Sequence, residues 1–229
     1  MRKFIFTTLI SLLLSACSSG GGSSNETSNT TTTESFSFSP GLYTGTFATS
    51  GGSTDSFAIM ITSNNKWAGA DPEEASTGTV NGATLSNTFG FSATLESANS
   101  GTFTNGTESG SFSIASVSGL YDRTSSLDKL NGTWVDDEFT DVTGTATFTF
   151  NNGALSMTTV SGCSGTGNIT TIDTRKNEYA LTVTVSNCDE FNGNYSGFGF
   201  TDDVNFTDDQ FAFVVDNSEN FALFAPVKQ

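Results

Sequence analysis

Acidic side chains that could ligate a metal ion or act in acid–base catalysis gather in the second half of this 229-residue chain. They form three groups along the sequence: Asp136, Asp137, Glu138 and Asp141; Asp189 and Glu190; and Asp202, Asp203, Asp208 and Asp209. Carboxylate oxygens are the ligands that Ca²⁺ prefers, so the last group is the candidate calcium site. Its spacing matches no EF-hand loop, and solvated turns use the same residues, so both interpretations stay open.

The residue inventory limits what catalysis the chain can perform. The sequence contains no histidine, which excludes Ser-His-Asp and Cys-His arrangements and imidazole acid–base chemistry. It also lacks a Gly-x4-Gly-Lys phosphate-binding loop. Paired carboxylates could still hydrolyse glycosides, although that chemistry usually belongs to larger scaffolds with deep clefts. We therefore expect no enzymatic activity and no cofactor, and a carboxylate-based hydrolase remains the third alternative.

The elements that must position these residues are expected to be β-strands. Apolar residues alternate with polar ones over 89–95, 146–150 and 181–185, which is the period-2 pattern of a strand with one buried face. Asn-Gly, Gly-Gly and Asp-Asp pairs interrupt these runs at short intervals. The sequence predicts an all-β fold, an antiparallel barrel or sandwich, with one helical turn within 124–130.

An internal repeat divides the chain into two related β units. The triplet at 41–43, Phe57 and the triplet at 101–103 correspond to 132–134, Phe148 and 193–195 at offsets of 91, 91 and 92 residues. A weaker correspondence links 77–79 to 164–166. We predict a first β unit at 38–121, a connector at 122–131 and a second β unit at 132–227. Whether the two units form separate barrels or complete one barrel is left open.

The N-terminal segment has the pattern of an export signal. Arg2 and Lys3 precede a short apolar stretch, which ends in Leu14-Ser15-Ala16-Cys17. This stretch is shorter than the ~20 apolar residues that a transmembrane helix needs. It resembles the lipobox of bacterial lipoprotein precursors, with 1–16 as the signal peptide and 17–36 as a lipidated cysteine and flexible tether. The resemblance implies that Cys17 carries diacylglycerol and that the protein is anchored to the membrane. In Gram-negative families, a serine after that cysteine favours the outer membrane.

The other two cysteines, Cys163 and Cys188, fall within one predicted run of strands. An oxidising compartment outside the cytoplasm allows such a pair to form a disulfide. Two cysteines without histidine are a poor metal-binding set. We predict a structural disulfide between them.

A possible ligand site is suggested by aromatic residues at the start of each unit. Gly132 and Trp134 resemble the Gly-x-Trp start of lipocalins and avidin-type barrels, and Gly41 and Tyr43 form a weaker copy. In those families the tryptophan closes one end of a barrel that holds a small hydrophobic ligand. Trp134 and Tyr43 are therefore candidate ligand-binding residues, and core packing is the alternative for both.

Charge and composition bear on the partners. A formal net charge of −16 would repel phosphate backbones, so no nucleic acid partner is expected. The lipidated cysteine and tether are also similar in arrangement to surface lipoproteins that bind protein partners. A glycan partner would need exposed aromatic residues, for which the candidates are Trp67, Tyr121, Tyr179 and Tyr195, with core packing as the favoured alternative for each. We expect an outer-membrane-anchored, non-enzymatic binding or envelope-structural module, or alternatively a lipocalin-like carrier of a small hydrophobic ligand.

Overall fold

A computed structural model of the chain describes most of the sequence after the predicted tether. The described residues are 35–71, 74–117, 119–137, 144–217 and 219–229. The predicted signal and Cys17 lie outside them, as do Glu138 and Asp141. Within these ranges, no helix is long and apolar enough to cross a membrane.

The first unit is a closed barrel in which each strand pairs antiparallel with its neighbours and β1 also pairs with β8. Its strands are β1 (Gly41–Thr49), β2 (Thr54–Ile61), β3 (Lys66–Ala70), β4 (Ala75–Asn81), β5 (Thr84–Ser86), β6 (Phe91–Leu95), β7 (Ser100–Asn105) and β8 (Glu108–Ser116). Because the sheet closes on itself, it leaves no unpaired edge.

The second unit is a similar barrel, closed by a β14–β15 pairing and by β17 between β15 and β9. Its strands are β9 (Gly132–Asp136), β10 (Ala146–Asn151), β11 (Ala154–Thr159), β12 (Ser164–Thr171), β13 (Tyr179–Ser186), β14 (Gly193–Asp202), β15 (Gln210–Asp216), β16 (Phe221–Phe224) and β17 (Val227–Lys228). The helical elements are α1 (Leu127–Leu130), before the first strand, and the 3₁₀ turn η1 (Asp189–Phe191), after β13.

The strands form where apolar and polar residues alternate. In β8, Phe112 and Ile114 point into the barrel, while the residues on either side of each are exposed. Tight turns join the strands: Gly106, between β7 and β8, has a φ of +60°, which glycine adopts without strain. Because each hairpin reverses the direction of the chain, every second strand–strand connection lies at the same end of its barrel.

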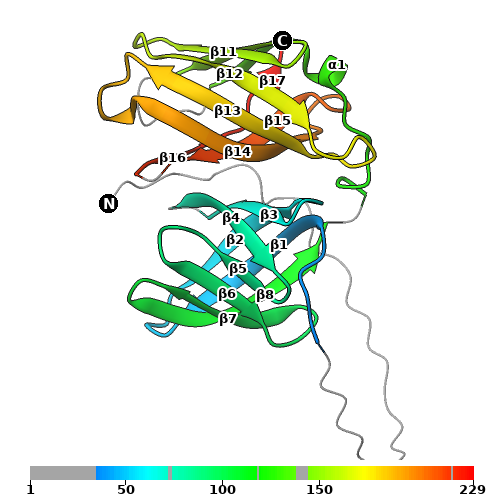
Figure 1. The fold of residues 1–229 in the computed structure, drawn as a ribbon, viewed down its shortest axis with the longest axis vertical. Coiled ribbons are helices and arrows are strands. Elements are labelled where there is room, and N and C mark those ends of the chain that lie inside the picture. Colours follow the sequence, from blue (N-terminus) through cyan, green and yellow to red (C-terminus); the bar gives the residue numbers. More distant parts are fainter. Residues whose placement is uncertain (1–34, 72–73, 118, 138–143, 218) are drawn as a thin grey trace, which may run out of the picture.

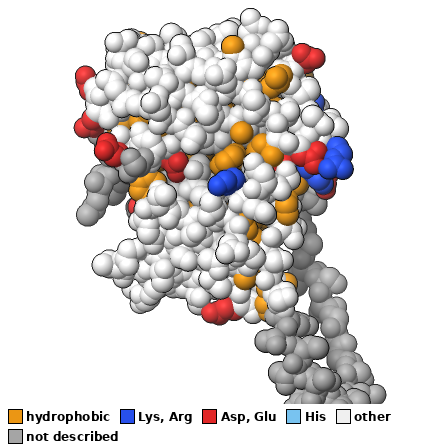
Figure 2. Space-filling model, viewed as in Figure 1, with side chains coloured by type: hydrophobic (Ala, Val, Ile, Leu, Met, Phe, Trp, Pro, Cys, Tyr) orange, Lys and Arg blue, Asp and Glu red, His pale blue; other side chains and the backbone are white. Residues whose placement is uncertain are grey.

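The two units are stacked against each other, with β3 and β4 of the first facing β14, β15 and β16 of the second (Figure 1). Hydrophobic side chains are visible along this junction in Figure 2. Leu42, Met60 and Tyr121 form one apolar cluster of the junction, and Ala68, Ala75 and Val214 form another. Strand β15 is accordingly buried on both faces.

Two carboxylates with little or no exposure join the units. Glu178 accepts hydrogen bonds from the Ser63 N–H (2.8 Å), the Ser63 hydroxyl and the Tyr121 hydroxyl (2.8 Å). Asp216 accepts from the Thr77 N–H (2.7 Å) and the Thr77 hydroxyl (2.9 Å). Burial raises the pKa of Asp216 and is also the main reason that the Tyr121 pKa is raised. These hydrogen bonds fix the orientation of one barrel on the other.

The structure confirms the all-β prediction and the division into two related units, and it resolves the open alternative in favour of two barrels in tandem. It also confirms the disulfide: Cys163 and Cys188 are bonded, with their Cα atoms 4.8 Å apart. The bridge ties the start of β12 to the end of β13.

Candidate functional site

A cavity of about 490 Å³ extends from the interior of the first barrel past its rim, where Glu219 and Phe221 of the second unit also line it. That volume lies within the range of roughly 300–1,000 Å³ found for small-molecule sites. Its interior is lined by aromatic and aliphatic side chains, which include Phe38, Phe47, Phe57, Ile59, Trp67, Leu85, Phe103, Phe112 and Ile114. These residues belong to the core of the first unit or pack against it, so the inner part of the cavity lies within that core.

Small residues create this space. Gly69 on β3 and Ala93 on β6 line the cavity, and Ala93 is only 4% exposed. The second barrel carries large rings at its inward positions instead, and Phe148 packs edge-to-face against Phe213 at 5.5 Å. The other cavity described, in the second unit, has a volume of only about 70 Å³. The two barrels therefore share an architecture but differ in whether their interiors are filled.

The segment before β1 covers one end of the first barrel. The Phe38 N–H donates to the Gly82 carbonyl at 3.0 Å, in the turn between β4 and β5. The Phe38 ring stacks on Phe112 with the ring centres 6.4 Å apart. Phe38 thus packs into the end of the barrel where β1 begins, and the described lining leaves the opposite end as the mouth.

The mouth lies where β1–β2, β3–β4, β5–β6 and β7–β8 connect, and its rim is acidic. Asp55, Asp71, Glu74 and Glu108 line it from the first unit, and Glu219 reaches it from the β15–β16 turn of the second. We call these five residues the acidic rim. All but the half-buried Asp71 are exposed. The cavity is therefore apolar inside and negatively charged at its entrance.

Trp67 provides a natural reporter on the cavity wall. Its side chain is 5% exposed and lines the cavity, with its ring centre 5.5 Å from that of Phe91. The indole N–H donates to the Ser86 carbonyl at 3.1 Å, which fixes the orientation of the ring. The chain's other tryptophan, Trp134, lies in the second barrel.

The structure places the two candidate ligand residues outside this cavity. Trp134 is fully buried in the core of the second unit, where its indole N–H donates to the Leu130 carbonyl at 2.7 Å. Tyr43 packs at the edge of the first core, and its hydroxyl donates to the Ser39 carbonyl at 2.8 Å. Neither residue lines either described cavity. The larger cavity is thus in the first unit and not behind Trp134, because large aromatic rings fill the second.

The candidate calcium residues each have partners within the protein. Asp203 forms a bidentate ion pair with Arg123, with both N–O distances 2.7 Å, and this hydrogen bonding lowers the Asp203 pKa. Asp208 lies 2.9 Å from the Lys129 ammonium. Asp209 accepts three backbone N–H groups of the 204–206 turn, and Asp202 accepts the Asp203 N–H. No group of three or more metal-binding side chains occurs among the described residues.

The aromatic residues considered for glycan stacking are all buried. Tyr121, Tyr179 and Tyr195 are between 0% and 6% exposed, and Trp67 faces the cavity. The residues that line the cavity could not be predicted from the sequence. Strand pairing in the folded chain decides which small residues face the same barrel interior.

Comparison of the chain with protein-family models, with curated proteins and with solved structures found no match.

Proposed function

We propose that this protein is a lipid-anchored binding protein of the outer membrane whose first barrel holds a small hydrophobic ligand. One observation carries the ligand-binding part: a cavity of about 490 Å³ whose inner part lies in the core of the first barrel and is lined by aromatic and aliphatic side chains. Protein interiors normally pack without voids much larger than a water molecule, so a cavity of this size has a stability cost that a function must justify. The sequence pattern ending at Cys17 supports the anchored part.

The second barrel supports the binding unit and does not bind the ligand itself. Its core is filled, and its disulfide restrains the β12–β13 hairpin. No catalytic step is part of the proposal, and the protein is expected to bind and release its ligand unchanged.

Quenching of tryptophan fluorescence tests whether a hydrophobic ligand binds in the first barrel and not in the second. Bromine quenches indole fluorescence only at close range, so 11-bromo-1-undecanol is a suitable neutral probe. We expect it to quench Trp67 saturably, because Trp67 lines the cavity, and to leave Trp134 unaffected. The variant Trp67→Phe retains Trp134 as its only tryptophan and should show no saturable quenching.

A pair of alanine variants locates the binding. Ala93→Phe places a ring inside the cavity, whereas Ala115→Phe places the same ring on the exposed face of β8. We expect the first to weaken probe binding by more than about tenfold, since it removes the volume that the probe occupies. The second should bind as wild type does. Absence of saturable quenching in the wild-type protein would overturn the proposal.

The anchor is tested separately. Cys17→Ala should move the protein from the membrane fraction of the native host to the soluble fraction, and Ser24→Ala in the tether should not. Unchanged fractionation of Cys17→Ala would refute the lipid anchor and leave the cavity proposal intact.

A further inference from the structure

We infer that the ligand of the first barrel is a cationic amphiphile, with a hydrocarbon body in the cavity and a positively charged head group at the mouth. This inference rests on the proposed function and specifies its ligand class. It comes from the distribution of charge along the cavity, which is strongly asymmetric between interior and rim.

Every charged side chain in the described lining is acidic. The lining includes the five carboxylates of the acidic rim and neither lysine nor arginine. Lys66 begins β3 at the opposite end of the barrel, beside the β2–β3 connection. Asp55, Glu74, Glu108 and Glu219 therefore bring negative charge to the mouth.

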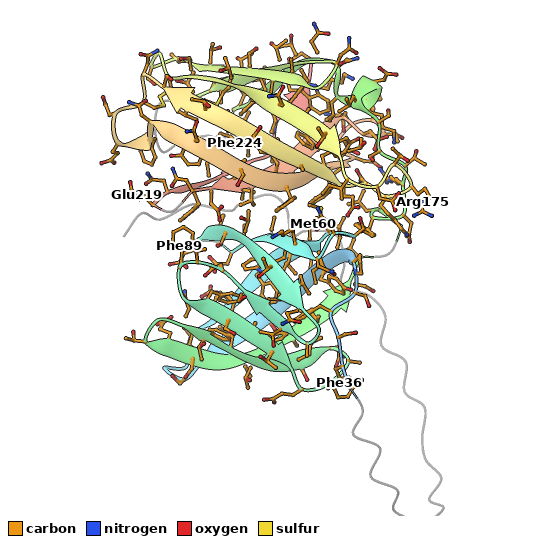
Figure 3. All side chains as sticks on the ribbon, viewed as in Figure 1. Phe36, Met60, Phe89, Arg175, Glu219 and Phe224 are labelled. Carbon is orange, nitrogen blue, oxygen red and sulfur yellow. A yellow bond between two sulfur atoms is a disulfide. The ribbon has the colours of Figure 1, made fainter. Side chains whose placement is uncertain are left out.

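The rim residues converge from separate parts of the chain. Asp71 accepts the Glu74 N–H at 2.7 Å, which links these two rim residues to each other. Glu74 in turn accepts the Asn105 side-chain amide at 3.2 Å, across to the β7–β8 connection. Glu219 comes from the second unit, and Figure 3 shows it on the same side of the molecule as Phe89, at the junction of the units. The rim is thus a built feature of the docked pair of barrels.

An amphiphile with a positive head group fits both parts of this site. The hydrocarbon body would bury itself against the phenylalanine and isoleucine side chains of the interior. The head group would remain in the field of the carboxylates, which low-dielectric walls around a cleft concentrate. Phe89, 43% exposed, lines the mouth and offers a ring face to a cation.

Other head groups fit less well. A carboxylate or phosphate head group would meet like charges at the mouth and could not reach a cation in the described lining. A metal ion alone would leave the apolar interior without a role, and the described residues hold no cluster that could bind one. The interior offers apolar walls below the rim, so a charged group placed there would lose its hydration.

The test compares three ligands that share a chain length and differ in charge: dodecylamine, dodecanol and dodecanoate. Each is titrated against bound 11-bromo-1-undecanol, and recovery of Trp67 fluorescence reports displacement. At neutral pH and about 0.02 M salt we expect dodecylammonium to bind about tenfold more tightly than dodecanol, and dodecanoate to bind more weakly than either. Raising the salt to about 0.5 M should reduce these differences, because screening acts on exposed charges.

Rim variants identify the source of the preference. The triple variant Glu74→Gln, Glu108→Gln and Glu219→Gln should reduce the preference for dodecylammonium over dodecanol to about twofold, and dodecanol affinity should stay unchanged. Glu96→Gln is the matched control, because Glu96 is exposed in the β6–β7 connection at the other end of the barrel. It should retain the full preference.

The outcomes separate the two proposals. Equal binding of the amine and the alcohol, or a preference that survives in the triple variant, would overturn the cationic assignment while the ligand-binding function stands. Failure of all three ligands together with failure of the neutral probe would refute the proposed function as well.

Discussion

Replacing Glu178 with alanine should strongly weaken the junction of the two barrels. Glu178 is fully buried and accepts three hydrogen bonds, two from Ser63 and one from Tyr121. Alanine leaves all three donors without their acceptor. The Tyr121 hydroxyl is buried, and a buried donor left unsatisfied costs about 1–3 kcal/mol, whereas the exposed Ser63 can donate to water instead. Together with the packing lost on truncating the side chain, this gives an expected net loss of about 2 kcal/mol in the free energy of unfolding.

A glutamine at the same position provides the decisive contrast. The glutamine oxygen can accept from the Ser63 N–H and from Tyr121, and its amide can donate to the Ser63 hydroxyl, which can act as acceptor. Glu178→Gln should therefore stay within about 1 kcal/mol of wild type. Glu96→Ala removes an exposed carboxylate that accepts a hydrogen bond from the Thr102 hydroxyl, and it should change stability by less than about 0.5 kcal/mol.

Urea unfolding followed by both far-UV circular dichroism and tryptophan fluorescence measures these values. One tryptophan lies in each barrel, so the fluorescence of Glu178→Ala in a Trp67→Phe background reports the second barrel alone. We expect the two probes to coincide in the wild-type protein and to separate in Glu178→Ala, because the barrels then unfold less cooperatively. A Glu178→Ala protein as stable as wild type would refute the assignment of the junction to this carboxylate.

Two further predictions concern the second unit. Reducing the Cys163–Cys188 disulfide, which spans 25 residues, should lower the free energy of unfolding by about 3.5 kcal/mol, and a thiol titration that finds both cysteines free before reduction would contradict it. Arg123→Gln should lower stability at pH 7 by about 0.5 kcal/mol, since the Arg123–Asp203 pair is partly exposed. Arg123 lowers the folded-state pKa of Asp203 below 3.8, so this contribution is present above that value and lost as the pH falls through the folded pKa. Urea unfolding at pH 7 and about pH 3 should accordingly show the variant and wild type converging in acid.

The fold could be predicted from the sequence because its determinants are local. Alternation over 146–150 and 181–185 corresponds to β10 and β13, and the single predicted helical turn is α1. The repeat was less accurate in detail. The weakest correspondence, 77–79 with 164–166, joins the fourth strands of the two units, β4 and β12. The stronger one, 101–103 with 193–195, joins a seventh strand to a sixth, because short Gly-aromatic motifs recur on many strands.

The site was harder to predict because it depends on volumes and not on motifs. The Gly-x-Trp pattern predicts a ligand-binding role for Trp134. A tryptophan at the start of a barrel can, however, fill the core as readily as it can close a cavity. What decides is the sum of the inward side chains: Ala93 and Gly69 leave space in one barrel, and Phe148 and Phe213 remove it in the other. Glu178 was missed for a related reason, since its partners Ser63 and Tyr121 lie far from it in the sequence and become its neighbours only when the barrels dock.

The junction between the units also explains how the second barrel, whose core is filled, contributes to the binding site of the first. Asp216 ends β15 and is held by the Thr77 N–H and hydroxyl on β4 of the first unit. The turn that follows Asp216 carries Glu219 to the cavity mouth. The same hydrogen bonds that dock the barrels therefore set the position of one carboxylate of the acidic rim. If the rim selects cationic ligands, the second barrel supplies part of that selectivity through Glu219. Weakening the Asp216–Thr77 contact should then reduce the preference for dodecylammonium over dodecanol, even though neither residue is part of the rim.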